Sequence, residues 1–328
     1  MDQALLGYIS RRVLQIPLLL VGISILTFLL MFLSPVDPVV AHFGLPIVQK
    51  MSDEDIMKVK DEWGLNEPLH VRYFSWISHL FQGDFGRSHI YKRPIIDIII
   101  EKLPATLYLS FVAYGVAIVL AILAALIVIS REGGLIDRII TNTSFLLYAA
   151  PSFFIALILI LVFSVWLGWL PSSRMVSISV PPGFFAELAD RIRHIILPAA
   201  ALGMSHFALF YGYLRSSLSE SIKQDYIITA RAKGIDERTI LIRHAFRNSL
   251  LPFVTQLGLA IPWLISGSVV IETIFAWPGI GRLTYDAAMK SDFMLLIGLT
   301  LFTSILVIIG NLLADIAYAI IDPRVRYE

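Results

Sequence analysis

The sequence predicts an all-α membrane protein with six transmembrane helices. Of its 328 residues, 57% are hydrophobic and only 16% are charged, whereas about a quarter of the residues in soluble domains are charged. The apolar residues gather in blocks, and a span needs about 20 of them. Six blocks qualify, at 12–33, 104–129, 140–168, 195–215, 250–272 and 293–320. The chain has no cysteine, which excludes disulfides and thiolate chemistry.

The first and fourth blocks need separate justification. The run within 12–33 is too long for a signal-peptide core and lacks a small-residue cleavage site, so we interpret it as a span that stays in the membrane. The block at 195–215 is the least apolar of the six. Its alanine, glycine and serine content favours close packing between helices.

The distribution of lysine and arginine predicts the orientation. With the N-terminus inside, 13 of the 26 basic residues lie in inner segments and 5 lie in short outer loops. The remaining 8 lie in the long loop after the first span, and long loops cross the membrane largely regardless of charge. We therefore expect the N-terminus, the segment 216–249 and the C-terminal tail 321–328 to be cytoplasmic.

The loop after the first span is long enough for a small extracytoplasmic helical domain, residues 34–103. Ser52 and Asp55 resemble a capping box ahead of a helix that ends near residues 63–64. Pro68 can start a second helix. We expect this helix to bury Tyr73, Phe74, Ile77, Leu80 and Phe81 on one side. The stretch PIIDIIIEK is expected at the interface, before Pro104 opens the second span.

The inner segment before the fifth span has the pattern of a folded helical hairpin. Apolar residues at a spacing of four predict one helical stripe, formed by Leu218, Ile222, Tyr226 and Ala230. Gly234 suits the end of a helix, and Asp236 can cap the next one. The apolar side of that second helix is expected to comprise Ile242, Ala245, Phe246, Ser249 and Leu250. Pro252 falls where the fifth span begins.

This hairpin cannot lie in hydrocarbon. It carries Arg231, Arg238, Arg243 and Arg247, and one arginine at the bilayer centre costs about 2.5–3.5 kcal/mol on insertion scales. Two interpretations remain open: a basic inner loop whose stripe packs on its own bundle, or a docking surface for a cytoplasmic partner.

If the chain takes part in energised transport, the energy would have to come from another subunit. The chain has no G-x-x-x-x-G-K-[ST] phosphate-binding loop, so any ATP chemistry belongs to another subunit. The spans contain few ionisable residues, which disfavours a proton- or sodium-driven carrier. A passive channel remains open.

A few polar residues do fall in or near the spans. We expect His206 to be a hydrogen-bonded interior residue, with a place in a substrate path as the alternative. Glu272 either lines an outer vestibule or pairs with Arg282. Asp315 is expected at the interface, paired with a basic residue, and Asn311 can bridge spans by hydrogen bonding.

The sequence does not indicate an enzyme or a metal site. Four histidines lie in the outer domain, His42, His70, His79 and His89. Their spacing matches no ligand motif, so we expect no metal. No Gly-x-Ser-x-Gly motif and no Ser/His/Asp grouping is present.

The stretch DYIITARAKGIDERTILIRHAFRNSLLP closely resembles the cytoplasmic signature of permease subunits of binding-protein-dependent ATP-binding-cassette (ABC) importers, in their dipeptide/oligopeptide/nickel branch. The resemblance covers nearly the whole chain, through YISRRVLQIP, GDFGRS, LPATL, ETIFAWPGIGRL and IIDPRVR in that order. The chain departs from the broad family motif in two places. Residues 228–230 replace Glu-Ala-Ala, and Leu251-Pro252 comes later than usual.

The resemblance implies a type I ABC importer permease fold, with residues 104–320 as the core domain. It implies a prokaryotic plasma (inner) membrane, a homologous second permease, two cytoplasmic ATPases that bind ATP and Mg²⁺, and an extracytoplasmic solute-binding protein. The chain itself would be non-catalytic and would bind no nucleic acid. The segment that couples to the ATPase would centre on Asp225, Tyr226, Ala230, Arg231, Ala232, Lys233, Gly234 and Ile235.

Peptides, from dipeptides to oligopeptides, are the first substrate that the resemblance implies. The same branch also imports oligosaccharides and nickel, and nothing in the spans decides between them. Two alternatives from other classes are a passive channel and a structural membrane subunit.

Overall fold

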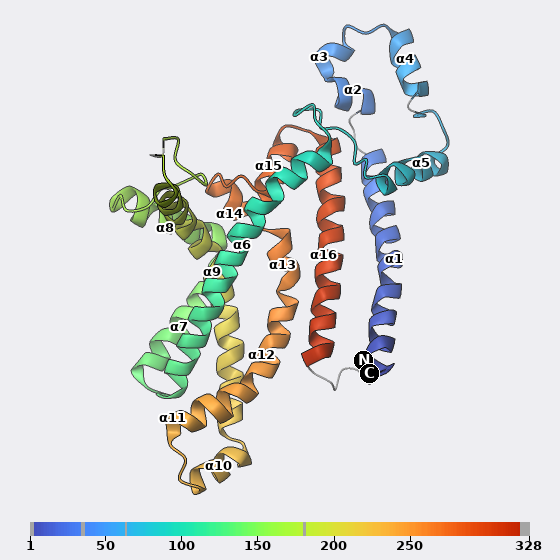
Figure 1. Ribbon diagram of the computed structural model, residues 1–328. Helices are drawn as coiled ribbons and strands as arrows, with labels where there is room; N and C mark the ends of the chain where they lie inside the picture. Colours follow the sequence, from blue (N-terminus) through green and yellow to red (C-terminus); the bar gives the residue numbers. More distant parts are fainter. Residues whose placement is uncertain (1–2, 34–36, 63, 180–181, 322–328) are drawn as a thin grey trace.

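The computed structural model describes residues 3–33, 37–62, 64–179 and 182–321, and long helices dominate it (Figure 1). Four helices are long and apolar enough to cross a membrane: α1 (Gln3–Phe32), α6 (Ile95–Ile129), α9 (Phe184–Ile222) and α16 (Phe293–Ile321). A bent pair of helices makes a fifth candidate if it counts as one span. The all-α membrane class is therefore confirmed, whereas two of the six predicted spans are interrupted.

The third predicted span, 140–168, is not one straight helix. Helix α7 (Leu135–Ala149) is followed by α8 (Ser152–Leu159) and the π-helix η1 (Ile160–Trp166), with a bend of 110° at the break. Ala150 has an extended backbone, φ −75° and ψ 132°. The cause is Pro151, because a proline disfavours helical geometry in the residue before it.

The fifth predicted span, 250–272, is also broken. It comprises α12 (Arg247–Leu259), α13 (Ile261–Ser266) and α14 (Val269–Ile274). Gly267 ends α13 with a φ of 66°, a left-handed conformation that interrupts helices and favours glycine. The prediction of an uninterrupted helix was wrong because apolar content alone does not reveal this turn.

Small residues hold α6 and α9 close together at the centre of the molecule. The buried side of α6 includes Ala113, Ala117, Ala121 and Ala125. A Cβ atom on Gly203 of α9 would lie 2.8 Å from the carbonyl oxygen of Ala113. The predicted close packing of the 195–215 block is therefore confirmed.

Helix α6 begins nine residues earlier than predicted. It runs from Ile95 to Ile129 without a break at Pro104, so the prediction that Pro104 opens the helix was wrong. Ile95, Ile98 and Ile99 are buried in a second apolar cluster with residues of α15 (Ile280–Met289) and α16. The free energy gained from this burial offsets the loss of the backbone hydrogen bond that a proline removes from a helix.

The two ends of the molecule carry different elements. The beginning of α1, the end of α16 and the hairpin around α10 lie at one end, and α2–α5, α14 and α15 lie at the other (Figure 1). Arg12 Nε lies 3.3 Å from Asp315 Oδ2, which confirms the predicted pairing of Asp315 with a basic residue. The start of α1, the end of α16 and the hairpin thus lie at the same end of the molecule, as the predicted topology requires.

The segment after α1 contains four short helices. They are α2 (Pro38–Phe43), α3 (Leu45–Val48), α4 (Asp53–Glu62) and α5 (Leu69–Phe81). The Ser52–Asp55 cap is confirmed, because the Asp55 N–H donates to Ser52 Oγ over 3.2 Å. Helix α4 has Glu62 as its last residue, while residue 63 lies outside the described residues. As predicted, α5 follows Pro68 directly.

The predicted buried side of α5 was partly wrong. Phe74 is 68% exposed and Phe81 is 87% exposed, and no residue of α5 is buried. Tyr73 and Trp76 carry its contact with α1. This contact covers a narrow strip of the helix, and Phe74 and Phe81 outside that strip remain exposed.

Candidate functional site

The hairpin before the fifth predicted span consists of α10 (Asp225–Ala232), α11 (Glu237–Thr239) and the π-helix η2 (Ile240–Phe246). Helix α9 ends at Ile222, and Gln224 is extended, with φ −76° and ψ 151°. The predicted single stripe from Leu218 to Ala230 is therefore interrupted. The four-residue spacing persists across the break, which is why the sequence pattern did not show it.

Two turn residues of the hairpin have the predicted roles. Gly234 has a φ of 75°, the left-handed conformation that ends a helix. Asp236 caps the next helix, because its side chain accepts a hydrogen bond of 2.9 Å from the Thr239 N–H. Both predictions are confirmed.

One side of α10 is buried against the rest of the chain. Ile227 is fully buried and Ala230 is 5% exposed. They belong to the same apolar cluster as Ile240 and Ala245 of η2. These four residues attach α10 firmly to the helix that continues into α12.

The π-helix changes which residues of the second helix face inward. Ile242 was predicted on the buried side but is 47% exposed, whereas Ile240 is buried. In a π-helix the backbone hydrogen bonds join residues five apart. Ile240 and Ala245 therefore point the same way, and the prediction failed because it assumed an α-helical period.

The other side of α10 is exposed. Its exposed residues follow helical spacing and comprise Asp225, Ile228, Thr229 and Ala232. Ile228 is an apolar side chain that is 58% exposed, and sequence reasoning missed it. The available signal was its position opposite Ile227 and Ala230 on a helical wheel. An exposed isoleucine on a charged helix is a candidate contact for a protein partner.

The eight residues predicted to couple to an ATPase have different positions. Ala230 faces the chain's own core, and Ile235 is half-buried. The others are exposed: Asp225, Tyr226, Arg231, Ala232, Lys233 and Gly234. The structure thus brings most of them to one accessible end of the hairpin.

Ion pairing within the hairpin already engages part of its charge. Arg231 donates to both carboxylate oxygens of Glu237, over 2.7 and 3.1 Å. The hydrogen bond from Arg231 lowers the pKa of Glu237. Hydrogen bonds from the Thr239 side chain and backbone lower the pKa of Asp236. Both carboxylates are therefore ionised at neutral pH and hold the turn in place.

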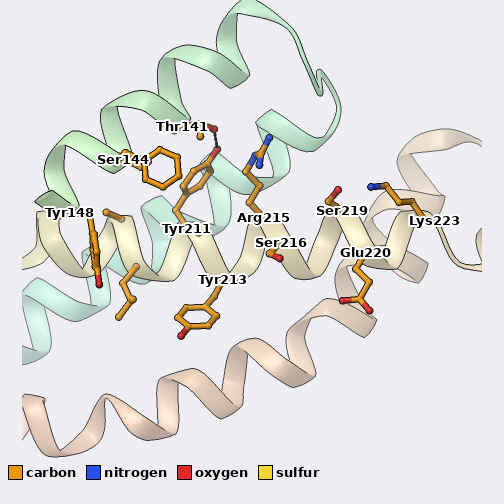
Figure 2. A pocket seen from close by; sticks show the side chains of 14 residues that line it. Thr141, Ser144, Tyr148, Tyr211, Tyr213, Arg215, Ser216, Ser219, Glu220 and Lys223 are labelled. Atoms are coloured by element: carbon orange, nitrogen blue, oxygen red, sulfur yellow. Dashed lines mark hydrogen bonds between the residues drawn. The ribbon is translucent and has the colours of Figure 1, made fainter.

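A cavity with both apolar and polar lining residues lies where α7 and α9 face each other (Figure 2). Its volume is about 710 Å³. Hydroxyl-bearing and charged side chains line it, among them Tyr148, Tyr213, Arg215, Glu220 and Lys223. The cavity therefore presents both signs of charge, and it lies on the part of α9 that leads to the hairpin.

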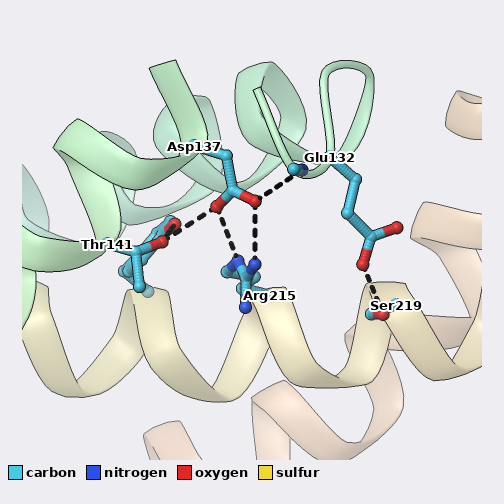
Figure 3. A network of polar contacts seen from close by, with 7 residues as sticks. Glu132, Asp137, Thr141, Arg215 and Ser219 are labelled. Atoms are coloured by element: carbon cyan, nitrogen blue, oxygen red, sulfur yellow. Dashed lines mark hydrogen bonds and ion pairs between the residues drawn. The ribbon is translucent and has the colours of Figure 1, made fainter. Parts of the chain in front are cut away.

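A buried carboxylate fixes the turn between α6 and α7 to α9 (Figure 3). Asp137 is 5% exposed and accepts hydrogen bonds from Arg215 over 3.0 and 3.2 Å. Gly133 N–H and Thr141 Oγ1 also donate to it, each over 2.9 Å. The sequence analysis missed this network, although Asp137 and Thr141 are spaced four apart on one helix face.

His206 lies inside the bundle, as predicted. Its Nε2 is 2.8 Å from the Tyr114 hydroxyl, and its Nδ1 is 2.9 Å from the carbonyl oxygen of Leu202. The interpretation of a hydrogen-bonded interior histidine is confirmed. Asn311, in contrast, is exposed on α16, and among the described residues the predicted hydrogen bond to another span is not formed.

Glu272 is fully buried near the end of the molecule that carries α14 and α15. It accepts hydrogen bonds from Thr106 Oγ1 over 2.9 Å and from the Arg282 N–H over 3.1 Å. The predicted partner was the Arg282 guanidinium, which instead donates to the carbonyl oxygen of Ala276. A Cβ atom on Gly279 would clash with Glu272, so the PGIG turn leaves room for this carboxylate.

Potential metal ligands do not cluster in the part of the chain that the structure describes. No three His, Asp or Glu side chains gather there in a way that could hold an ion. The side chain of His42 lies outside the described set. The expectation of no metal therefore stays a prediction.

Comparison with known proteins shows the family. Residues 117–327 match the family described as binding-protein-dependent transport system inner membrane component. Residues 5–110 match the family that describes the N-terminal part of such membrane components. The chain is 42% identical to the oligopeptide transport system permease protein AppB of Bacillus subtilis (strain 168), across 98% of this chain and 99% of the relative.

Other relatives align over the same length. The chain is 35% identical to a putative peptide permease protein of Brucella suis biovar 1 and 33% identical to the probable peptide ABC transporter permease protein y4tP of Sinorhizobium fredii. Each alignment covers 98% of this chain and 99% of the relative. The resemblance that the sequence motifs indicated is confirmed: the chain belongs to the inner membrane permease components of binding-protein-dependent ABC transport systems.

Proposed function

We propose that this chain is one permease half of an ATP-driven importer that moves dipeptides and oligopeptides into the cell. One observation carries the proposal: over 98% of its length the chain is 33–42% identical to proteins named as oligopeptide or peptide permeases. An extracytoplasmic solute-binding protein would deliver the peptide. A homologous second permease would form the other half of the pathway.

The exposed side of α10 is the proposed docking surface for a cytoplasmic ATPase. Two such ATPases would bind ATP and Mg²⁺, and this chain would remain non-catalytic. Ile228 supports the proposal because full burial of an isoleucine stabilises a contact by about 1.5–3 kcal/mol. An exposed ion pair contributes about 0–1 kcal/mol, and Arg231 is already paired with Glu237. Apolar insertion should therefore dominate the affinity.

The attachments of α10 suggest how its motion would reach the membrane. Helix α9 has 39 residues, which corresponds to a length of about 58 Å, and it packs along α6 and α7. The Asp137–Arg215 pair ties the α6–α7 turn to the same helix. A displacement of α10 by the ATPase would therefore carry α7 and α9 together, and this motion would switch the bundle between inward- and outward-facing states.

The cavity between α7 and α9 is the proposed inner part of the peptide path. Tyr148 and Tyr213 offer hydroxyls to peptide groups, and Glu220 and Lys223 offer charges of both signs for the peptide termini, while Arg215 is paired with Asp137. The second permease would close its open side. The cavity is not lined by the three residues that the sequence placed near a path, His206, Glu272 and Asn311. If they contact the peptide, they do so at another point along the path.

We further propose six membrane passes, with α12 and α13 together forming the fifth, in the inner membrane of a prokaryote. Both termini would be cytoplasmic, and residues 34–103 would form a domain outside the cell membrane. The lysine and arginine distribution supports this orientation. The shared end of α1, α16 and the α10 hairpin supports the even number of passes (Figure 1).

Purification of the chain from its native membrane in a mild detergent, followed by mass spectrometry, tests this function. The proposal expects an ATPase with a phosphate-binding loop and a second six-span permease, and binding of a labelled peptide when the solute-binding protein is added. Recovery of the chain alone, with ion conductance in bilayers, would instead indicate a passive channel. A complete complex that transported only an oligosaccharide or nickel would overturn the peptide assignment and leave the ATP coupling intact.

A further inference from the structure

Helix α5 leaves two phenylalanine side chains uncovered where α1 ends. The helix runs across the end of α1 rather than along it (Figure 1). Phe81 and Phe74 are 87% and 68% exposed. The contacts between α5 and α1 determine which way these side chains point.

Tyr73 marks the side of α5 that faces the membrane-spanning part of α1. Its hydroxyl is 2.7 Å from Ser24 Oγ, and its ring lies 5.4 Å from the ring of Phe28. The apolar span of α1 extends to Leu30. Ser24 lies six residues before that end, a depth of about 9 Å, so Tyr73 reaches into the region that lipid surrounds.

Two further contacts lie nearer the end of α1. Trp76 contacts Phe28, with 5.8 Å between ring centroids. The Arg72 guanidinium lies 5.7 Å from the ring centroid of Phe32. From Ser24 towards Phe32, the contacting residue of α5 thus changes from Tyr73 to Trp76 and then to Arg72.

This order gives the rotation of α5 about its axis. At about 100° per residue, Trp76 lies about 60° from Tyr73 on the wheel, and Arg72 lies about 100° from Tyr73 in the same direction. That direction leads away from the membrane centre. In the opposite direction, Phe81 lies about 80° and Phe74 about 100° from Tyr73. The two phenylalanines therefore point towards the membrane centre.

The opposite edge of α5 is polar. Ser75 and His79 are exposed, and both fall on the side of Arg72, away from the phenylalanines. The helix therefore has an edge on the membrane side that carries the two phenylalanines, with His70 beside them at the start of the helix, and a polar edge on the water side. An amphipathic helix that lies in the plane of a bilayer has this arrangement, with its apolar face about 5–10 Å into the headgroup and acyl boundary.

We propose that α5 is an interfacial helix whose Phe74–Phe81 edge inserts into the lipid surface beside α1. The inference requires that α1 crosses the bilayer, and it does not depend on which solute the transporter moves. Lipid fits this edge better than a protein partner because α1 also exposes apolar side chains on the side that meets α5, namely Val21 at 50% and Ile25 at 43%. On the helical wheel both lie within about 60° of the stripe through Ser24 and Phe28 that α5 contacts. Insertion would hold α4 and α5 at a fixed height above the membrane.

Fluorescence quenching by lipids tests the proposal, and the chain suits it because it has no native cysteine. Single variants Phe74→Cys and Phe81→Cys would carry an environment-sensitive nitrobenzoxadiazole label. Ser75→Cys and His79→Cys are the matched controls on the polar edge. Each variant would be studied in the complete transporter in nanodiscs, with and without lipids that carry a nitroxide near the headgroup.

We expect nitroxide lipids to quench the label strongly at positions 74 and 81 and weakly at positions 75 and 79. Adding the solute-binding protein should not change this difference. Equal quenching on both edges would overturn the proposal, and so would protection of positions 74 and 81 by the binding protein or the second permease. Either phenylalanine position alone decides the question if the other variant is unstable. Quenching does not depend on uptake, so a transporter inactive towards peptides can still confirm it.

Discussion

At the scale of single residues, Gly234 determines how the hairpin of α10, α11 and η2 turns. Its φ of 75° costs an L-residue about 1–2 kcal/mol. A Cβ atom there would meet no other atom within 4 Å. The requirement for glycine therefore comes from the backbone conformation and not from lack of space.

Because the requirement at Gly234 concerns the backbone conformation, two substitutions there should behave differently. Gly234→Val should distort the turn and uncouple ATP hydrolysis from peptide uptake, because a β-branched residue is an outlier in this conformation. Gly234→Asn should keep most of the coupling, because asparagine tolerates the conformation. The ratio of peptide transported to ATP hydrolysed in proteoliposomes checks this. Normal coupling in the valine variant would count against the role of the turn.

The carboxylates of the same turn make the stability of the hairpin depend on pH. The pKa values of Asp236 and Glu237 are lowered from their usual values of 3.8 and 4.5 by hydrogen bonds. A lowered pKa in the folded state contributes stability that is complete above the usual value and is lost as pH falls through the folded-state value. The hairpin should thus be equally ordered from pH 6 to 8, and it should open only as the pH falls below these usual values.

Hydrogen–deuterium exchange over 225–246, corrected for its intrinsic pH dependence, measures this opening. The double variant Asp236→Asn, Glu237→Gln should lose the acid-induced step, because neither amide titrates. If the double variant still opened in the same pH range, other groups would be responsible.

Glu272 illustrates a residue whose role is packing and hydrogen bonding. Replacing it with alanine would leave Thr106 Oγ1 and the Arg282 N–H without their acceptor, at a cost of about 1–3 kcal/mol for each unsatisfied group. Glu272→Gln retains one acceptor oxygen, so this variant should lose less stability than Glu272→Ala. Thermal unfolding of the purified complex should rank wild type above Glu272→Gln and Glu272→Gln above Glu272→Ala. Equal stability of the alanine variant would show that water replaces the carboxylate.

At the scale of elements, the contact between α6 and α9 depends on the absence of side chains. A Cβ atom on Gly203 would approach the backbone of Ala113, and backbone cannot move aside as a flexible side chain can. On the same helix, a Cβ atom on Gly212 would meet nothing within 4 Å. The two glycines therefore provide a matched pair.

Gly203→Ala should force the helices apart and destabilise the protein by about 1–3 kcal/mol, the usual cost of overpacking. Gly212→Ala should be neutral or slightly stabilising, because alanine is the better helix former. Melting temperatures of the two variants in the same detergent check this. A Gly203→Ala variant as stable as wild type would mean that the crossing is looser than the structure shows.

The elements also show where sequence reasoning succeeds. Gly234 and Asp236 could be predicted because turn and cap residues act through their own backbone and nearest neighbours. The exposure of Ile242 and of Phe74 could not be predicted. The exposure of Ile242 depends on a π-helical segment, and the exposure of Phe74 depends on which strip of α5 contacts α1. Both effects are set by tertiary packing, which a helical period does not encode.

At the scale of the whole molecule, the sequence predicted the class, the relative placement of the ends and the family. It did not reveal the Asp137–Arg215 pair, because 78 residues separate the partners and only the packing of α7 on α9 brings them together. It likewise did not reveal the cavity beside them. The hairpin, this ion pair and the long helix α9 form one connected unit from the proposed docking surface into the bundle.

The central claim is that ATP hydrolysis by a partner drives peptide import through contacts on α10. Uptake of a radiolabelled oligopeptide into proteoliposomes that contain the complete transporter tests it most directly. We expect uptake to require ATP and the solute-binding protein. Ile228→Glu should abolish both uptake and ATPase association, whereas Met57→Glu, an exposed position in α4, should retain the ATPase. Uptake without ATP, or full ATP-driven uptake by Ile228→Glu, would contradict the claim.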